Sequence, residues 1–98
     1  MTQTTGPEEA IARAFISAVP HARELGVEVE CTGDGAAELV LRWREDLVGD
    51  PASGVIHGGA VFTLMDTAAG AAVLAHPQVN GPTATLGLRI DYMRAATP

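Results

Sequence analysis

The fold of this chain is decided by one stretch, His57-Gly58-Gly59-Ala60-Val61-Phe62-Thr63-Leu64-Met65-Asp66-Thr67-Ala68. The two glycines precede a run over residues 60–75 that has no lysine, arginine or glutamate, and Asp66 is its only charge. Because the run is rich in alanine, leucine and methionine, it predicts a helix of about four turns. An apolar composition on every side predicts that this helix is buried nearly all round.

The glycine pair at the start of this predicted helix leaves backbone N–H groups accessible. Such groups have no partner inside the helix and lie at the positive end of its dipole. They suit an anion or a developing oxyanion. Gly58 and Gly59 are equally explained by a tight loop that needs positive φ or close packing, and both explanations can hold together.

Asp66 is the costly residue of the stretch, because a carboxylate in apolar company loses its hydration. It could be satisfied by a hydroxyl or a backbone amide, as many buried acids are. Beside the glycine pair, a catalytic role is the favoured hypothesis.

The spacing between Gly58 and Asp66 limits how they can act together. They are eight residues apart, which is roughly 12 Å along one helix. A reacting carbon must lie about 3 Å from both its nucleophile and its oxyanion donor. One chain therefore cannot supply both groups to one substrate, whereas two antiparallel copies across a two-fold axis could, and a catalytic pair would make the dimer obligatory.

The chain before this stretch predicts helices followed by a hairpin. Residues 1–6 are polar and predicted to be flexible, and residues 7–25 form a helical segment. Its predicted apolar face is Ile11, Ala14, Phe15, Ala18 and Val19. From residue 27 the apolar period changes to two, which predicts two strands around the turn at residues 33–35. Residues 47–56 are predicted to be a loop.

The chain after the stretch predicts one long strand. His76-Pro77 ends the helix, and Asn80-Gly81-Pro82 is typical of a turn. Apolar residues then alternate with polar ones over residues 84–92, the pattern of a half-buried strand. The sum is a single α+β domain over residues 1–98.

Composition narrows the class of protein. A chain of 98 residues with 47% hydrophobic and 18% charged residues predicts one small folded domain. Six cations against twelve acids, net −6, argue against nucleic acid or an anionic membrane as partner. The single cysteine, Cys31, and three histidines without metal-ligand spacing predict no metal site. Without a secretion signal or a spanning segment, we expect a cytoplasmic protein.

The quoted stretch resembles the motif of hotdog-fold acyl-CoA thioesterases of the PaaI-like (phenylacetic acid degradation type) group. Residues 20–26, 48–56 and 84–95 resemble the same family. The resemblance implies an antiparallel sheet wrapped around one central helix, working as a homodimer or a dimer of dimers with sites at the interface. The family's sheet continues beyond the strand that ends this chain, so the last strands are expected to be lacking and the chain to be C-terminally truncated.

The resemblance implies roles for individual residues. Asp66 would be the nucleophile or the general base for water, and the amide of Gly58 or Gly59 would polarise the thioester carbonyl. His57 would hold the loop and the carbonyl. Three residues are candidates for substrate binding: Asp50, near the position of an asparagine in many relatives, and Arg89 and Arg94, for the phosphates of coenzyme A.

The activity implied is hydrolysis of acyl-CoA thioesters to free acid and CoA, with no cofactor beyond the coenzyme A of the substrate. The alternative is a non-catalytic acyl-CoA-binding or dimerisation module. A hotdog dehydratase or hydratase is less favoured. A resemblance to those enzymes would imply a histidine paired with an acid on the helix, and no histidine lies in residues 60–75.

Overall fold

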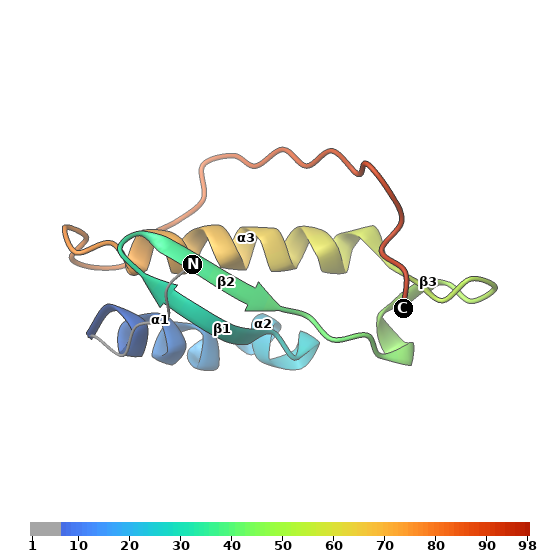
Figure 1. Cartoon of the computed structure of the whole chain (residues 1–98), viewed down its shortest axis with the longest axis horizontal. Coiled ribbons are helices and arrows are strands. Elements are labelled where there is room, and N and C mark those ends of the chain that lie inside the picture. Colours follow the sequence, from blue (N-terminus) through green and yellow to red (C-terminus); the bar gives the residue numbers. More distant parts are fainter. Residues whose placement is uncertain (1–6) are drawn as a thin grey trace.

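The longest element is helix α3, Gly58–Leu74, which lies along the long axis of the molecule (Figure 1). This computed structural model describes residues 7–98, and the predicted flexible segment 1–6 lies outside the described residues. Two helices and a hairpin pack on one side of α3, and the C-terminal segment arches past its other side. None of the helices in residues 7–98 is long and apolar enough to cross a membrane.

Helices α1, Pro7–Ala18, and α2, Pro20–Leu25, occupy the predicted helical segment. Each begins with a proline, which suits the first position of a helix because that N–H has no helical partner. α2 ends where Gly26 adopts φ 78°. The Gly26 N–H donates to the carbonyl of Arg23 at 3.1 Å, and that of Val27 to the carbonyl of Ala22 at 3.0 Å, so the last turn is closed.

The apolar face predicted for α1 is confirmed in part, since Phe15 and Val19 are half-buried and pack against the core. Ala12 and Ile16 are the buried residues, whereas Ile11 is 53% exposed and Ala14 is also exposed. Alanine is compatible with both a buried and an exposed face of a helix, so the sequence pattern alone does not identify which face of α1 is buried. Ala12 lets the helix approach its neighbours closely, and Ile16 fills the space that remains.

The predicted hairpin is confirmed as strands β1, Glu28–Gly33, and β2, Ala36–Val40, which pair antiparallel. Asp34 and Gly35 form its turn with φ 51° and 78°, the two positive angles that a type I′ turn requires. The pairing is offset between Val29 and Cys31 by a bulge. Burial, reinforced by the nearby Glu38 carboxylate, raises the pKa of the Cys31 thiol, which agrees with a packing role for this residue.

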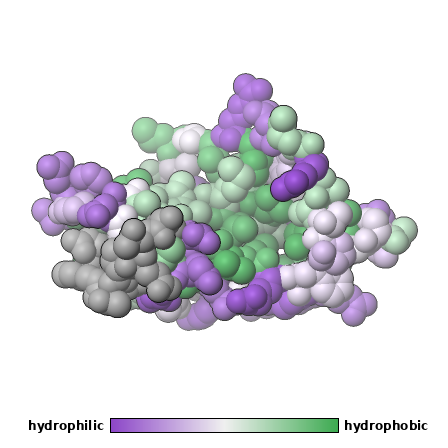
Figure 2. Space-filling view, viewed as in Figure 1, coloured by the Kyte–Doolittle hydropathy of each residue, from purple (hydrophilic) through white to green (hydrophobic). Residues whose placement is uncertain are grey.

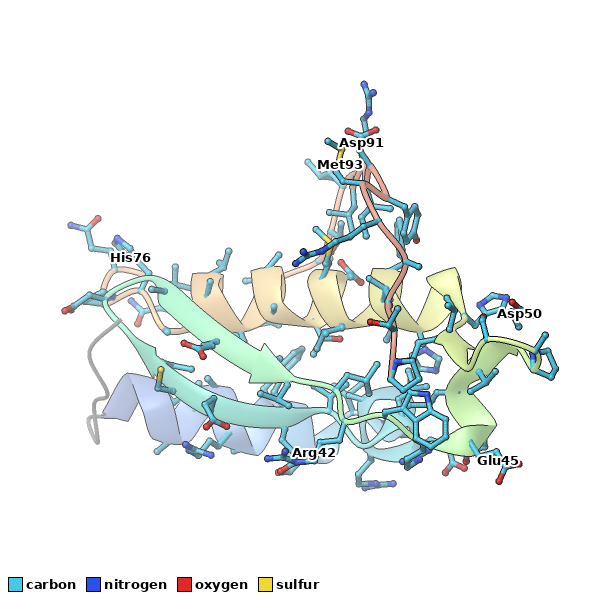
Figure 3. All side chains as sticks on the ribbon, turned by 45° about the vertical axis from the view of Figure 1, so that its right-hand side comes forward. Arg42, Glu45, Asp50, His76, Asp91 and Met93 are labelled. Atoms are coloured by element: carbon cyan, nitrogen blue, oxygen red, sulfur yellow. The ribbon has the colours of Figure 1, made fainter. Side chains whose placement is uncertain are left out.

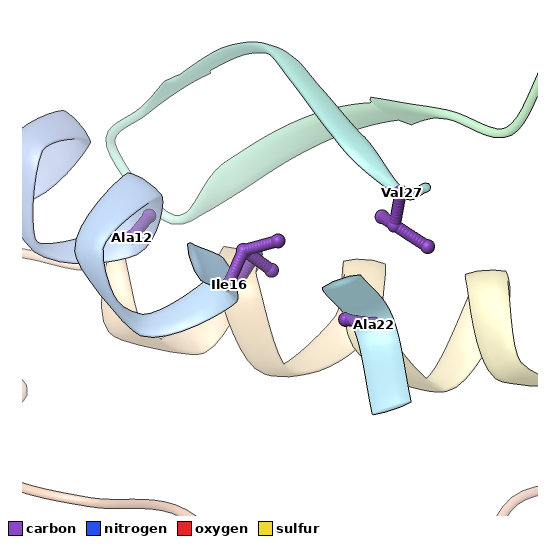
Figure 4. Close-up of a cluster of buried hydrophobic side chains, with 5 residues drawn as sticks. Ala12, Ile16, Ala22 and Val27 are labelled. Atoms are coloured by element: carbon purple, nitrogen blue, oxygen red, sulfur yellow. The ribbon is translucent and has the colours of Figure 1, made fainter. Parts of the chain in front are cut away.

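The core is a small cluster where α1, α2, α3 and the residue before β1 meet (Figure 4). Its buried members are Ala12, Ile16, Ala22, Val27 and Ala71. Three of the five are alanines, so backbones approach closely and little side-chain volume is enclosed. Partly buried residues from the hairpin and from α3 extend this cluster.

The segment predicted as a loop contains short regular elements instead. A 3₁₀ turn, η1, Glu45–Leu47, leads into strand β3, Val48–Asp50, which pairs antiparallel with β4, Val55–Ile56. The Asp50 carboxylate explains why two such short strands can pair. It accepts hydrogen bonds from the Ser53 hydroxyl at 2.6 Å and the Ala52 N–H at 3.3 Å, which closes the turn between them.

Helix α3 is confirmed, but its predicted burial on every side is wrong. Its buried residues are Ala60, Ala71 and Leu74. Phe62, Met65 and Val73 are 38%, 42% and 45% exposed. Figure 2 shows hydrophobic residues gathered in a hollow at the middle of the molecule, bordered by hydrophilic ones. The apolar composition of α3 therefore provides more hydrophobic surface than this chain covers by itself.

The strand predicted over residues 84–92 is also absent: in the described chain, residues 84–98 form no strand. The segment is extended, and Leu86 and Met93 are 106% and 91% exposed. A strand requires a neighbouring backbone for its hydrogen bonds, and this segment arches away from the hairpin (Figure 1). Near its end, the Ile56 N–H donates to the Ala96 carbonyl at 3.0 Å.

Candidate active site

His57 forms the N-cap of α3 and holds the first turn of the helix. Its Nδ1 accepts a hydrogen bond from the Gly59 N–H at 2.9 Å, and its carbonyl accepts one from the Ala60 N–H at 3.0 Å. Its own N–H donates to the Leu47 carbonyl at 2.8 Å, which ties the helix start to η1. Because Nδ1 is an acceptor here, the proton of the neutral ring is on Nε2.

The two glycine amides, which the sequence did not distinguish, differ in the structure. The Gly59 N–H is engaged by the His57 ring. The Gly58 N–H makes no hydrogen bond to another of the described residues 7–98. Since Gly58 is the first residue of α3, its N–H also lies at the positive end of the helix dipole. Gly58 is therefore the better candidate for binding an anion or an oxyanion.

Asp66 lies two turns further along α3. It is half-buried, whereas the sequence predicts that it is enclosed in apolar surroundings. Its Oδ1 accepts a hydrogen bond of 2.6 Å from the Thr85 hydroxyl. Thr85 was missed by sequence reasoning, although it is a hydroxyl on the polar side of the alternating segment. The bond orients the Asp66 carboxylate and leaves its Oδ2 without a hydrogen bond in the described residues.

Gly58 and Asp66 lie on one continuous helix, so their backbones are about 12 Å apart at 1.5 Å per residue. The structure therefore has the distance between Gly58 and Asp66 from which the sequence predicts a site shared by two subunits.

A cavity of about 690 Å³ lies beside Asp66, between α1, α2, α3 and the start of the C-terminal segment. Apolar side chains of Phe15, Val19, Phe62 and Val73 contribute to its walls. An apolar cavity of this size with a carboxylate at its wall has the features of a site for a small organic ligand.

Two polar side chains connect this cavity to the start of α3. The Thr63 hydroxyl donates to the Gly59 carbonyl at 3.0 Å. The same oxygen lies 3.2 Å from the His21 Nε2, at hydrogen-bond distance. His21 and Thr63 thus join α2 to the glycine turn, which comprises residues 57–59. The sequence did not predict this connection.

Arg44 links the end of α2 to η1, the element that contacts the glycine turn through the Leu47 carbonyl. Its guanidinium donates to the carbonyls of Glu24 and Leu25, each at 3.2 Å, and pairs with the Asp46 carboxylate at 2.9 Å. A hydrogen bond from the Arg44 guanidinium holds the pKa of the Asp46 carboxyl below its ordinary value, so that carboxyl stays ionised. The end of α2 is thereby tied to η1, the element whose Leu47 carbonyl receives the His57 N–H.

The three predicted substrate-binding residues lie apart from the cavity wall. Both carboxylate oxygens of Asp50 are bonded within the turn that they close (Figure 3). Arg89 pairs with Asp91 at 3.2 Å on the C-terminal segment, with its side chain 87% exposed. Arg94 is also exposed. His57, Gly58 and Gly59 are neighbours in sequence at the start of α3, and Asp66 lies eight residues beyond Gly58 on the same helix. A role for Asp50 or the arginines stays a prediction.

The close contact between Gly49 and the His57 backbone can be tested by substitution. A methyl group at Gly49 would lie 2.9 Å from the His57 Cα and 3.3 Å from its backbone N, so the backbone must move. We expect Gly49→Ala to lower the free energy of unfolding by about 1–3 kcal/mol, as overpacking does, in urea denaturation. Gly70→Ala is the matched control, because, apart from its chain neighbours and the nearby backbone of its own helix, no atom of the described residues lies within 4 Å of the added methyl. In mid-helix it should raise stability by about 0.5–1 kcal/mol, and equal effects of the two changes would contradict the close contact.

No group of three or more histidine, cysteine, aspartate or glutamate side chains suited to a metal ion occurs within the described part of the chain.

Comparison with known proteins relates this geometry to one family. The model of the thioesterase superfamily matches residues 53–98, which contain the glycine turn, Asp66 and Thr85. A crystal structure of a protein from the thioesterase superfamily superposes with a TM-score of 0.82 at 33% identity, covering 95% of this chain and 69% of the other. A Pseudomonas aeruginosa crystal structure gives a TM-score of 0.79 at 41% identity, covering 94% and 68%.

Two curated relatives extend the comparison. A Halobacterium salinarum protein named "Putative esterase" is 42% identical over 76 residues, or 74% of this chain and 50% of its own length. The Escherichia coli medium/long-chain acyl-CoA thioesterase YigI is 27% identical over 97 residues, covering 86% of this chain and 63% of its own length. The chain thus spans half to just under two thirds of the length of these relatives.

Proposed function

Because the chain belongs to the thioesterase superfamily and has its α+β hotdog fold, we propose that it hydrolyses acyl-CoA thioesters to free acid and CoA. The observation that carries the proposal is the pair of groups on α3: a Gly58 N–H unbonded within residues 7–98 and an Asp66 carboxylate oriented by Thr85. The thioesterase name of one relative adds support. We also propose that the chain falls in the PaaI-like group, whose motif residues 57–68 resemble.

The proposed reaction uses Asp66 as the general base. Its carboxylate takes a proton from water as the water oxygen attacks the thioester carbon, and the carbonyl electron pair moves onto oxygen. The Gly58 N–H donates to this oxyanion. The carbon–sulfur bond then breaks as the carbonyl re-forms, and the proton held by Asp66 passes to the departing thiolate. The products are a carboxylic acid and CoA.

We propose that each site is formed by two subunits of a homodimer, with Asp66 from one and Gly58 from the other. The separation of about 12 Å along α3 prevents one chain from placing both groups on one carbon. A two-fold axis between antiparallel α3 helices would bring each Asp66 to the partner's glycine turn. The exposed Phe62, Met65 and Val73 supply apolar surface that such packing would cover. A dimer of dimers is an equally acceptable assembly.

We propose that the acyl group of the substrate binds in the apolar cavity of about 690 Å³ beside Asp66. Its walls carry aromatic and aliphatic side chains but no lysine or arginine, so they suit a hydrocarbon tail better than a charged one. Coenzyme A belongs to the substrate, so the reaction needs no further cofactor. A cytoplasmic location is part of the same proposal.

The proposal is tested by thiol release from a panel of short-chain, long-chain and aromatic acyl-CoAs. We expect turnover of at least one of them, with the ranking across the panel defining the acyl class. Thermal stabilisation by an acyl-CoA without release of thiol would contradict hydrolysis and favour the alternative, a non-catalytic binding module.

A further inference from the structure

The peptide bond between Gly58 and Gly59 is held by hydrogen bonds at both of its ends. Its carbonyl oxygen, on Gly58, accepts from the Tyr92 hydroxyl at 2.8 Å. Its N–H, on Gly59, donates to the His57 Nδ1 at 2.9 Å. The tyrosine contact is tertiary, since Tyr92 follows Gly58 by 34 residues, whereas the histidine contact is local, since His57 precedes Gly59 by two residues. The orientation of this peptide is therefore set by one tertiary and one local contact.

The Tyr92 ring also lies against the glycine turn. A methyl group placed on Gly58 would contact the ring carbons and the hydroxyl oxygen at 3.5 Å. The neighbours of Tyr92 behave differently, because Asp91 and Met93 lie at the outer edge of the segment, away from α3 (Figure 3). The alternation that predicted a strand over residues 84–92 thus has another consequence: the Tyr92 hydroxyl reaches the start of α3, while the residue stays 55% exposed.

From these contacts we infer that Tyr92 is a positioning residue for the oxyanion donor of the proposed thioesterase, an inference that rests on the proposed function. Gly58 and Gly59 form the start of α3, where helix ends fray most easily, and two glycines have no side chains to oppose that fraying. The Tyr92 hydroxyl and the His57 ring oppose it from the two ends of the peptide. The Gly58 N–H belongs to the preceding peptide, whose His57 carbonyl accepts from the Ala60 N–H at 3.0 Å. With the Gly58–Gly59 peptide also held, the first turn of α3 keeps its shape, and the Gly58 N–H needs no reorganisation when the oxyanion forms.

Tyr92→Phe is the direct test, because it retains the ring and removes the hydroxyl. We expect kcat for the best acyl-CoA to fall about three- to tenfold, the value of one neutral hydrogen bond. KM should stay within about twofold, and the pH–rate profile should keep its midpoint, because the Asp66 carboxylate is unchanged. The carbonyl ¹³C signal of Gly58 should move upfield in NMR as its hydrogen bond is lost. Met93→Ala, on the exposed side of the same segment, should change none of these quantities.

The outcomes distinguish failure of this inference from failure of the proposed function. An active wild type with unchanged kcat and Gly58 signal in Tyr92→Phe would overturn the role of Tyr92 alone. A rise in KM at constant kcat would also overturn it, since Tyr92 would then bind substrate. A wild type that releases no thiol from any acyl-CoA would overturn the function and, with it, the positioning role. Thermal unfolding of each variant shows that a lower kcat does not reflect unfolded protein.

Discussion

Replacing Asp66 by asparagine is expected to lower kcat for acyl-CoA hydrolysis by about 10²- to 10⁴-fold, the contribution typical of a general base. Asparagine has nearly the same shape, and its Oδ1 can still accept the Thr85 hydrogen bond seen at 2.6 Å. What it loses is the ability to take a proton from water. The variant should therefore bind acyl-CoA as the wild type does and release almost no thiol, measured by thiol detection and by calorimetric binding in parallel.

Asp34→Asn is the matched control for this substitution. Asp34 is exposed in the hairpin turn with φ 51°, a conformation that asparagine also adopts. The control removes the same charge and should leave kcat and stability within ordinary surface variation, about 0.5 kcal/mol. An Asp66→Asn variant that kept more than a tenth of the wild-type kcat would exclude Asp66 as the base, whatever the dimer structure.

The parts of the site that the sequence predicted are those that depend on local chemistry. A histidine before two glycines and an apolar run contains the information for a capped helix start, because the cap, the glycines and the helix are neighbours in sequence. The hairpin turn was predictable for the same reason, since Asp34 and Gly35 supply both positive φ angles themselves. The spacing of Gly58 and Asp66 needed only the helix rise.

The parts that the sequence did not predict depend on what lies beside each element. The pattern over residues 84–92 is that of a strand, but a strand forms only against a partner backbone, and within the described residues none lies alongside. The apolar run of α3 predicts burial, but composition does not determine whether the same chain or another one covers the helix. Thr85 and Tyr92 approach α3 only through the path of the C-terminal segment, which no local pattern encodes.

Replacing Gly58 by proline removes the backbone N–H to which the proposal assigns the oxyanion, and we expect kcat to fall about 10²- to 10³-fold. Few positions permit this test, but the first residue of a helix is where proline fits best. The preceding residue is also suitable, because His57 has ψ 134°, within the range that proline allows before it. Gly58→Ala retains the N–H, and its methyl group meets Tyr92 at an ordinary 3.5 Å, so it should keep most of the activity. Equal activity in the two variants would assign the oxyanion to another donor.

The Gly58→Pro and Asp66→Asn chains together test whether two subunits share each site. If Asp66 of one chain faces Gly58 of its partner, a mixed dimer contains one intact site, since the proline chain supplies Asp66 and the asparagine chain supplies Gly58. Unfolding and refolding the two inactive variants together at equal concentration makes half of the dimers mixed, and about one quarter of wild-type activity should return. Each variant refolded alone should stay inactive. If both groups acted from a single chain, every site in the mixture would lack one of them and no activity would return. Recovered activity would therefore show that the first residue of α3 and Asp66 at its middle serve two different sites.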